Sequence, residues 1–112
     1  MAKWLLVVYT DSADPSREEE FNEWYDKIHL PDVLEVPGFI RATRYVNTDT
    51  NAGPGKFLAT YEIESEDIDE TMAALKETMA KKRQQGRFSD LLVVVSRPTY
   101  RQIGSLARQG VH

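Results

Sequence analysis

The sequence predicts a single α+β domain with one antiparallel sheet and two helices on one face of it. Two observations predict this class. Strand-like and helix-like patterns follow one another in the order β-α-β-β-α-β, and the chain has only 112 residues, a length that suits one hydrophobic core. Residues 1–101 are expected to form the domain, and residues 102–112 a basic C-terminal tail.

The first half of the chain is expected to contain a strand, a helix and a second strand. Residues 4–9 are apolar at every position, which is typical of a strand covered on both faces. A helix is expected to begin at Asp14-Pro15, or at the capping box Ser16–Glu19, and to end near Pro31. Residues 39–46 then alternate as a strand, with one face carrying Phe39, Arg41, Thr43 and Tyr45.

The second half repeats this alternation of element types. A loop rich in Gly and Pro precedes a strand over residues 57–63. A helix is expected from about residue 65 to residue 85, where Gly86 stops it. Its apolar stripe is Ile68, Met72, Leu75 and Met79. Residues 91–95 are apolar throughout and form a fourth strand.

This order of elements, with right-handed crossovers, gives a ferredoxin-like βαββαβ fold with a four-stranded antiparallel sheet. Two helices cover only one face of such a sheet, yet the first and last strands are apolar on both faces. A second copy packed sheet to sheet is the simplest cover for the other face. The sequence therefore predicts a homodimer.

Composition excludes several classes of protein. The net charge of −4 disfavours nucleic acid as a partner, although residues 81–112 hold seven basic side chains and one acidic one. That stretch is interpreted as a solvated helix end and a tail that pairs with acidic surface. No apolar run is long enough to span a membrane, and no signal peptide is recognised, so a cytoplasmic protein is expected. The absence of cysteine excludes disulfides, iron–sulfur clusters and thiolate catalysis.

Histidine chemistry depends on one side chain, because His112 is the last residue and His29 is the only other histidine. His29 follows Tyr25 by four residues and Phe21 by eight, so the three share the apolar face of the first helix. A small planar ligand is expected between this helix and the sheet, with imidazole as general acid or base. Asp32 is placed to orient the imidazole or raise its pKa. The alternative is a packed core histidine bonded to a backbone carbonyl.

Residues of the strands are expected to line the same cavity, namely Arg41 and Thr43, with Tyr45 and Tyr61 as further lining groups. In this pattern Arg44 lies on the opposite face of its strand. It is expected either to form an ion pair across the dimer or to bind a substrate carboxylate. The carboxylates are scattered around one internal histidine without metal-ligand spacing. Neither a metal nor an organic cofactor is therefore expected.

One stretch of the sequence carries a family resemblance. Phe21-Asn22-x-Trp24-Tyr25-x-x-x-His29-x-Pro31-Asp32, followed by Pro37-Gly38-Phe39 and Arg44-Tyr45, resembles the EthD-like branch of the dimeric α/β-barrel superfamily. The resemblance implies a ferredoxin-like protomer whose sheet joins its partner's to close a barrel, with a pocket between helices and sheet in each subunit. It also implies that the motif histidine, His29, transfers protons. The haem branches use a histidine late in the chain, a place that only His112 fills, so haem is not expected.

Together these observations lead us to expect an enzyme, a cofactor-independent lyase, isomerase or cyclase acting by proton transfer on a small aromatic, polyketide-like or lactone substrate. His29 and Tyr25 are the expected catalytic pair. The alternatives are a non-catalytic dimeric protein that binds a small ligand, a cofactor-free oxygenase, and a structural dimer without a cavity. The expected substrate-binding residues are Phe21, Trp24, Asp32, Arg41, Tyr45 and Tyr61.

Overall fold

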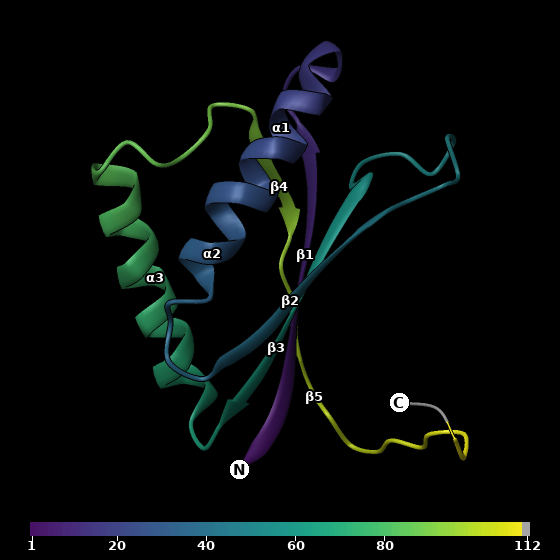
Figure 1. Ribbon diagram of the computed structural model, residues 1–112, viewed down its shortest axis with the longest axis vertical. Helices are drawn as coiled ribbons and strands as arrows, with labels where there is room; N and C mark the ends of the chain where they lie inside the picture. The colour runs from purple at the N-terminus through teal and green to yellow at the C-terminus, as the bar shows by residue number, and fades with distance from the viewer. Residues whose placement is uncertain (111–112) are drawn as a thin grey trace.

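The computed structural model describes residues 1–110 and shows one antiparallel sheet with its helices on a single face (Figure 1). The strands run in the order β2-β3-β1-β4, and β5 also pairs with β1. The predicted α+β class and the βαββαβ order are confirmed, whereas His112 lies outside the described residues. The strands are β1 (Ala2–Ser12), β2 (Phe39–Val46), β3 (Phe57–Ser65), β4 (Leu92–Ser96) and β5 (Thr99–Arg101).

The described sheet has five strands, not the predicted four, because the last strand is interrupted. β4 pairs with the second half of β1 and β5 with the first half. Pro98 lies between them, and its carbonyl accepts a hydrogen bond from the N–H of Val7 at 2.9 Å. A proline has no N–H to continue a ladder, so the edge strand breaks at this residue and resumes one residue later.

The first helical region is two residues longer than predicted and has four parts. A 3-10 turn (Pro15–Arg17) capped by Asp14 leads into α1 (Glu18–Trp24), a π-helical turn (Tyr25–His29) and α2 (Leu30–Val33). The helical region was expected to end near Pro31, and it ends two residues later, at Val33. The wide π turn, in which the N–H of Leu30 donates to the carbonyl of Tyr25, precedes Pro31 and relaxes the crowding that a proline ring causes in a regular helix.

The second long helix, α3 (Ile68–Gln84), begins three residues later than predicted because Asp67 caps it. The Asp67 carboxylate accepts from the N–H of Glu70 at 3.2 Å. Gly86, with a φ of +74°, follows the helix in the left-handed conformation that ends many helices. The predicted apolar stripe packs against the core through Ile68, Met72, Leu75 and Met79.

The hydrophobic core fills the space between the helices and one face of the sheet. Its members include Leu6, Phe21, Tyr25, Tyr61 and Ile63, all at most 2% exposed. None of the helices within residues 1–110 is both long and apolar enough to cross a membrane. The opposite sheet face, hereafter the outer face, is uncovered in the single chain. Large apolar side chains that remain exposed on β1, β2 and β4 include Tyr9, Tyr45, Val93 and Val95.

A β-bulge near the start of β2 changes which side chains face the core. Phe39 pairs with Ile63, and the register then shifts so that Arg41 pairs with Glu62. Ile40 is the extra residue and is 56% exposed. Because one inserted residue reverses the alternation, Phe39 shares the helix-facing side with Ala42 and Arg44. Arg41 and Tyr45 consequently belong to the outer face.

Candidate functional site

His29 occupies the last position of the π-helical turn, on the side of the helix that faces the core. Its ring stacks on Trp24 with centroids 4.9 Å apart and an interplanar angle of 21°. Tyr25 and Phe88 meet it edge-on at 4.9 and 5.5 Å. π-helical turns are rare and are often found at functional sites, and this one gathers three aromatic rings around a single imidazole.

Burial is the main influence on the charge of His29. Burial, opposed by the charge of Asp32 and assisted by that of Arg44, lowers the pKa of the imidazole from 6.5 to about 4. At neutral pH the ring is therefore uncharged. A neutral imidazole can accept a proton, which is the state that a general base requires.

A buried cluster of two phenols and a guanidinium lies beside this histidine. Tyr25 and Tyr61 are each 1% exposed, and the Arg44 guanidinium carbon lies 4.3 Å from the centre of the Tyr25 ring. Arg44 donates to Asp26 Oδ1 at 3.0 Å and to Asn22 Oδ1 at 2.9 Å. Burial raises the pKa of both tyrosines, and that of Tyr61 rises well above 10, further increased by neighbouring Tyr25.

Two polar atoms of this cluster have no hydrogen-bond partner among the described residues. They are Tyr61 Oη and Arg44 Nε, and both are buried. The Tyr25 hydroxyl lies near enough to the Tyr61 hydroxyl to raise its pKa, but the two do not form a hydrogen bond of normal geometry. Buried polar groups in proteins are almost always bonded, so each exception calls for an explanation. A ligand oxygen is one explanation, because both atoms are donors.

Asp32 does not orient His29, contrary to one of the two predictions for it. Its carboxylate is 4% exposed and accepts two hydrogen bonds from Arg87, at 2.7 and 2.9 Å. The carbonyl of Arg87 in turn accepts from the indole Nε1 of Trp24 at 2.9 Å. Asp32 thus fixes the segment that carries Phe88 against His29, and its charge acts on the histidine pKa only from a distance.

The predicted site residues separate into two groups. Phe21, Trp24, Tyr25, His29 and Tyr61 come together between the helices and the sheet. The prediction that Arg41 shares their cavity is wrong, because the bulge at Ile40 turns it to the outer face. Tyr45 also lies on the outer-face side of β2, yet it still borders the cavity that Arg44 and Phe57 line. Arg41 is 71% exposed and lies 3.7 Å from Glu62.

Sequence reasoning missed the central position of Arg44. A signal was available, since its alternation partners Ala42 and Val46 are apolar, and an arginine within an apolar strand face needs buried partners. Phe88 and Arg87 were also missed. They follow Gly86 in a connecting segment, where no periodic pattern shows which side chains point toward the core.

Two cavities lie among the described residues, and neither includes His29. One, of about 280 Å³, is lined by Asn22, Asp26, Arg44, Tyr45, Val46 and Phe57. The other, of about 360 Å³, lies at the far end of the sheet beside β5. Within residues 1–110 no three His, Asp or Glu side chains are grouped as metal ligands.

Comparison with known proteins identifies the fold. No family model matches the sequence, and no curated protein is significantly similar to it. Solved structures are similar: HapK from Hahella chejuensis, at 18% identity and a TM-score of 0.71, covers 96% of this chain and 99% of its own. A dimeric ferredoxin-like protein from an uncultured marine organism gives 15% identity and a TM-score of 0.69, covering 96% and 100%.

An EthD family protein from Bacillus halodurans is also similar, with 18% identity, a TM-score of 0.58 and coverage of 92% of this chain and 100% of its own. The predicted likeness to EthD-like proteins is therefore confirmed at the level of the fold. The chain has the ferredoxin-like fold of the dimeric ferredoxin-like and EthD proteins over almost its whole length.

Proposed function

We propose that this chain is one subunit of a homodimeric enzyme that acts on a small organic molecule by proton transfer. The observation that carries the proposal is the pair of buried donors without partners, Tyr61 Oη and Arg44 Nε, beside an uncharged His29. The EthD-like motif supports a lyase, isomerase or cyclase that needs no cofactor, with a small aromatic, polyketide-like or lactone substrate.

The chemistry follows from what each group can do. His29 accepts a proton from a carbon next to a carbonyl group, and the electron pair of the broken C–H bond moves to the carbonyl oxygen as an enolate. Donors in a water-poor site stabilise such an oxyanion strongly. Tyr61 and Arg44 supply these donors, and Tyr25 lies between Arg44 and His29. The imidazolium then returns the proton to another atom of the product.

The substrate reaches these groups from the cavity of about 280 Å³ at the edge of β2. Arg44 lines this cavity and also packs on the Tyr25 ring, so it connects the open space with the buried cluster. Phe21 and Trp24, which contact Tyr25 ring to ring, form the apolar walls. Tyr45 borders the opening and is 55% exposed.

The homodimer is part of the proposal. The outer face exposes apolar side chains of β1, β2 and β4, and a surface of this kind is commonly covered by a partner. Two solved structures of this fold are described as dimeric ferredoxin-like proteins. Packing of two outer faces closes a barrel from two sheets and covers Tyr9, Val93 and Val95.

A second candidate function is the binding and delivery of a small ligand without chemistry. It is favoured by one observation, namely that three aromatic rings pack against His29 and neither cavity includes it. In that case the imidazole is a packing and hydrogen-bonding group. Both candidates predict ligand binding, but only the first predicts transfer of a proton.

Hydrogen–deuterium exchange separates the two. Protein in D₂O is incubated with 1,3-diketones, phenolic polyketide mimics and unsaturated lactones, and NMR follows deuterium at the carbon next to the carbonyl. We expect faster exchange with the native chain and a loss of about 10²-fold or more with His29→Ala. Circular dichroism and gel filtration verify that the variant folds and assembles normally.

No acceleration of exchange with any of these substrates, despite binding detected by calorimetry, refutes the catalytic proposal and supports ligand binding. Exchange that persists unchanged in His29→Ala refutes the role of His29. Uptake of O₂ during turnover, measured with an oxygen electrode, identifies the reaction as an oxygenation instead.

A further inference from the structure

The three rings around His29 differ in how firmly they are held. Trp24 and Tyr25 belong to the same helical region as His29. Tyr25 is 1% exposed, and the indole of Trp24 donates to the carbonyl of Arg87 at 2.9 Å. Phe88 instead belongs to the segment that runs from the end of α3 to β4 (Figure 1), and its side chain is only partly buried. Phe88 is therefore the ring that can leave the imidazole without disturbing the core.

The segment is anchored on both sides of Phe88 but not at Phe88 itself. The N–H of Arg87 donates to the carbonyl of Lys82 at 3.0 Å, and the hydroxyl of Ser89 accepts from the N–H of Leu91 at 3.0 Å. The backbone N–H and carbonyl of Phe88 have no backbone partner among the described residues. A partly exposed side chain at such a position can rotate into solvent while its neighbours stay in place.

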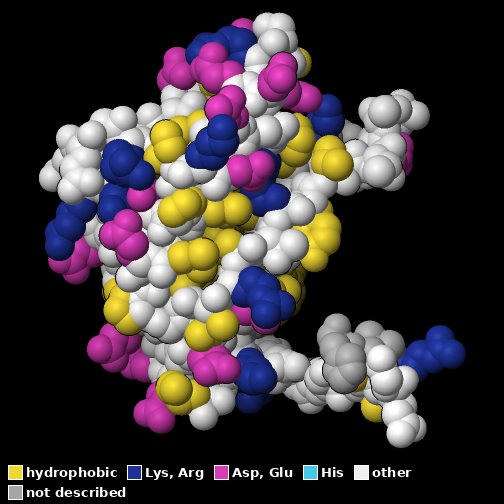
Figure 2. Space-filling view, viewed as in Figure 1, with side chains coloured by type: hydrophobic (Ala, Val, Ile, Leu, Met, Phe, Trp, Pro, Cys, Tyr) yellow, Lys and Arg dark blue, Asp and Glu magenta, His cyan; other side chains and the backbone are white. Residues whose placement is uncertain are grey.

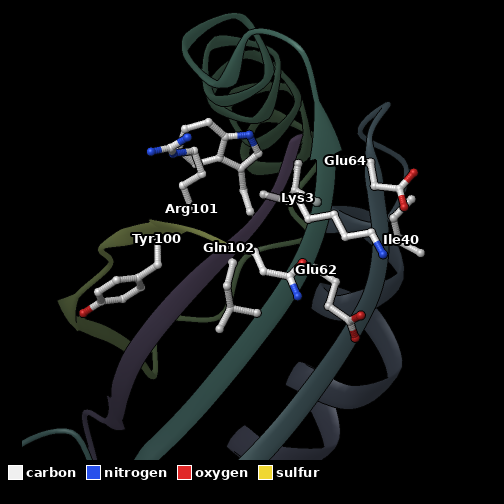
Figure 3. Close-up of a pocket in the computed structure, with 10 residues that line it drawn as sticks. Lys3, Ile40, Glu62, Glu64, Tyr100, Arg101 and Gln102 are labelled. Atoms are coloured by element: carbon white, nitrogen blue, oxygen red, sulfur yellow. The ribbon is translucent and has the colours of Figure 1, made fainter. Parts of the chain in front are cut away.

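Neither of the two cavities gives a substrate direct access to the imidazole. The larger one, shown in Figure 3, lies at the end of the sheet where β1 begins. The smaller one reaches Arg44, and the Tyr25 ring lies between the Arg44 guanidinium and His29. A substrate that contacts both Arg44 and the imidazole needs further room beside His29. Rotation of the Phe88 side chain supplies that room.

The Phe88 ring occupies a place that suits an aromatic ligand. His29 meets it nearly at right angles, with centroids 5.5 Å apart, and the Trp24 ring lies 6.2 Å away. The guanidinium carbon of Arg83 lies over the Phe88 ring, 4.3 Å from its centre. A ligand ring in the same place makes the same edge-to-face and cation–π contacts.

The charge at this end of α3 favours a ligand with an anionic group. Arg83 is exposed and forms no ion pair among residues 1–110. Lys82 pairs with Glu35 at 2.9 Å. Arg87 pairs with Asp32 at 2.7 Å. One positive charge, that of Arg83, is therefore left without a partner, and Figure 2 shows apolar side chains beside Lys and Arg side chains at the end of α3.

We propose that Phe88 occupies a binding subsite for the aromatic ring of the substrate, and that Arg83 binds a carboxylate carried by that ring. Binding rotates the Phe88 side chain into solvent and places the ligand ring against His29. Because Phe88 competes with the ligand for one place, it lowers the apparent affinity. The inference rests on the proposed function and narrows its substrate class to aromatic carboxylates.

Benzoate is the probe, and His29 reports where it binds. In a His112→Gln background His29 is the only histidine, so its imidazole carbon signal is unambiguous in NMR spectra of protein with isotope-labelled histidine. We expect Phe88→Ala to bind benzoate about tenfold more tightly than the parent chain, and the His29 signal to shift as the ligand ring arrives beside it. Tyr100→Ala removes an exposed ring from β5 and is the matched control, with the affinity of the parent chain.

The role of Arg83 is tested in the Phe88→Ala chain. We expect Arg83→Gln to weaken benzoate binding by about fivefold or more, and to weaken the binding of neutral benzyl alcohol less. Lys81→Gln removes a positive charge from the same end of α3, where Lys81 pairs with Glu77. This control is expected to change the benzoate affinity by less than about twofold.

Circular dichroism verifies that each variant folds. Phe88→Leu, which removes the ring but keeps an apolar side chain, replaces Phe88→Ala if the alanine chain does not fold, and its affinity is expected to change in the same direction. An unchanged benzoate affinity in the folded variant overturns the subsite, as does a His29 signal that does not move at saturation. Equal losses of benzoate and benzyl alcohol affinity in Arg83→Gln overturn carboxylate recognition.

The binding measurements need no turnover, so they fail separately from the catalytic proposal. Tighter benzoate binding by Phe88→Ala, without deuterium exchange in any substrate, leaves the subsite in place and refutes catalysis. Deuterium exchange that depends on His29, without tighter binding by Phe88→Ala, refutes the subsite and leaves catalysis in place.

Discussion

Asp32 and Arg87 form a bidentate ion pair that joins the end of the first helical region to the segment after α3. The bonds measure 2.7 and 2.9 Å, and the Asp32 carboxylate is 4% exposed. Lys82 adds a more distant contact with Asp32, at 3.8 Å. The pair determines where Phe88, the next residue, meets His29, so it acts on the candidate site through packing.

Arg87→Ala is expected to destabilise the fold, because it leaves a buried carboxylate without its main partner. The expected decrease in Tm is roughly 5–10 °C, measured by circular dichroism at pH 7. Lys81→Ala is the matched control, since Lys81 is 67% exposed and, within residues 1–110, forms an ion pair only with Glu77 on its own helix. Equal effects of the two substitutions contradict a structural role for the Asp32–Arg87 pair.

The histidine gives the stability of the fold a distinct pH dependence. In the unfolded chain His29 binds a proton below about pH 6.5, whereas in the folded chain it does so only near pH 4. The unfolded state therefore holds more protons between these values, and stability is lost as the pH falls from 6.5 to 4. The loss is at most about 3 kcal/mol.

Denaturant unfolding of the native chain and of His29→Phe, at several values between pH 4 and pH 7, measures this contribution. The difference in unfolding free energy between the two chains is expected to change over this window and to be constant above pH 7. Carboxylates titrate in both chains and cancel in the difference. A difference that does not depend on pH means that His29 titrates normally in the folded state.

The sequence predicted the order and type of the elements, because each carries its own periodicity. These patterns are all local: Asp14 caps the first helical turn, α3 carries an apolar stripe, and β1 is apolar on both faces. The errors occurred where one residue changes the phase of a pattern. The local sequence around Pro31 does not show whether a helix ends there or continues after a π turn. Nothing in the local sequence marks Ile40 as the extra residue of a β-bulge.

The same limit explains what could be predicted of the site. Residues of one helix, such as Tyr25 and His29, share a face by spacing alone. Arg44 and Arg41 exchanged faces because of a bulge, and Arg87 meets Asp32 across 55 positions of sequence. Contacts of that kind depend on how α3 packs beside α2, which no local pattern encodes.

Tyr61→Phe separates stability from activity. The substitution removes a buried hydroxyl that has no hydrogen-bond partner among the described residues, so we expect an unchanged or slightly higher Tm. If Tyr61 donates to the enolate, proton transfer falls by about 10²-fold. Thermal unfolding and the deuterium exchange assay on the same sample measure both effects. A large loss of stability contradicts the view that this hydroxyl is free to bind a ligand.

Arg44→Lys tests whether the planar guanidinium is needed and not only its charge. Arg44 is 13% exposed, bonds Asn22 and Asp26 with two different nitrogens and packs on the Tyr25 ring, and an ammonium group cannot make all three contacts. We expect kcat/KM to fall by roughly tenfold or more. Arg41→Lys is the control on the outer face and is expected to retain full kcat/KM. If Arg41→Lys lowers kcat/KM as much as Arg44→Lys does, the substrate contacts the outer face, and the assignment of the site to the helix-facing side of β2 is wrong.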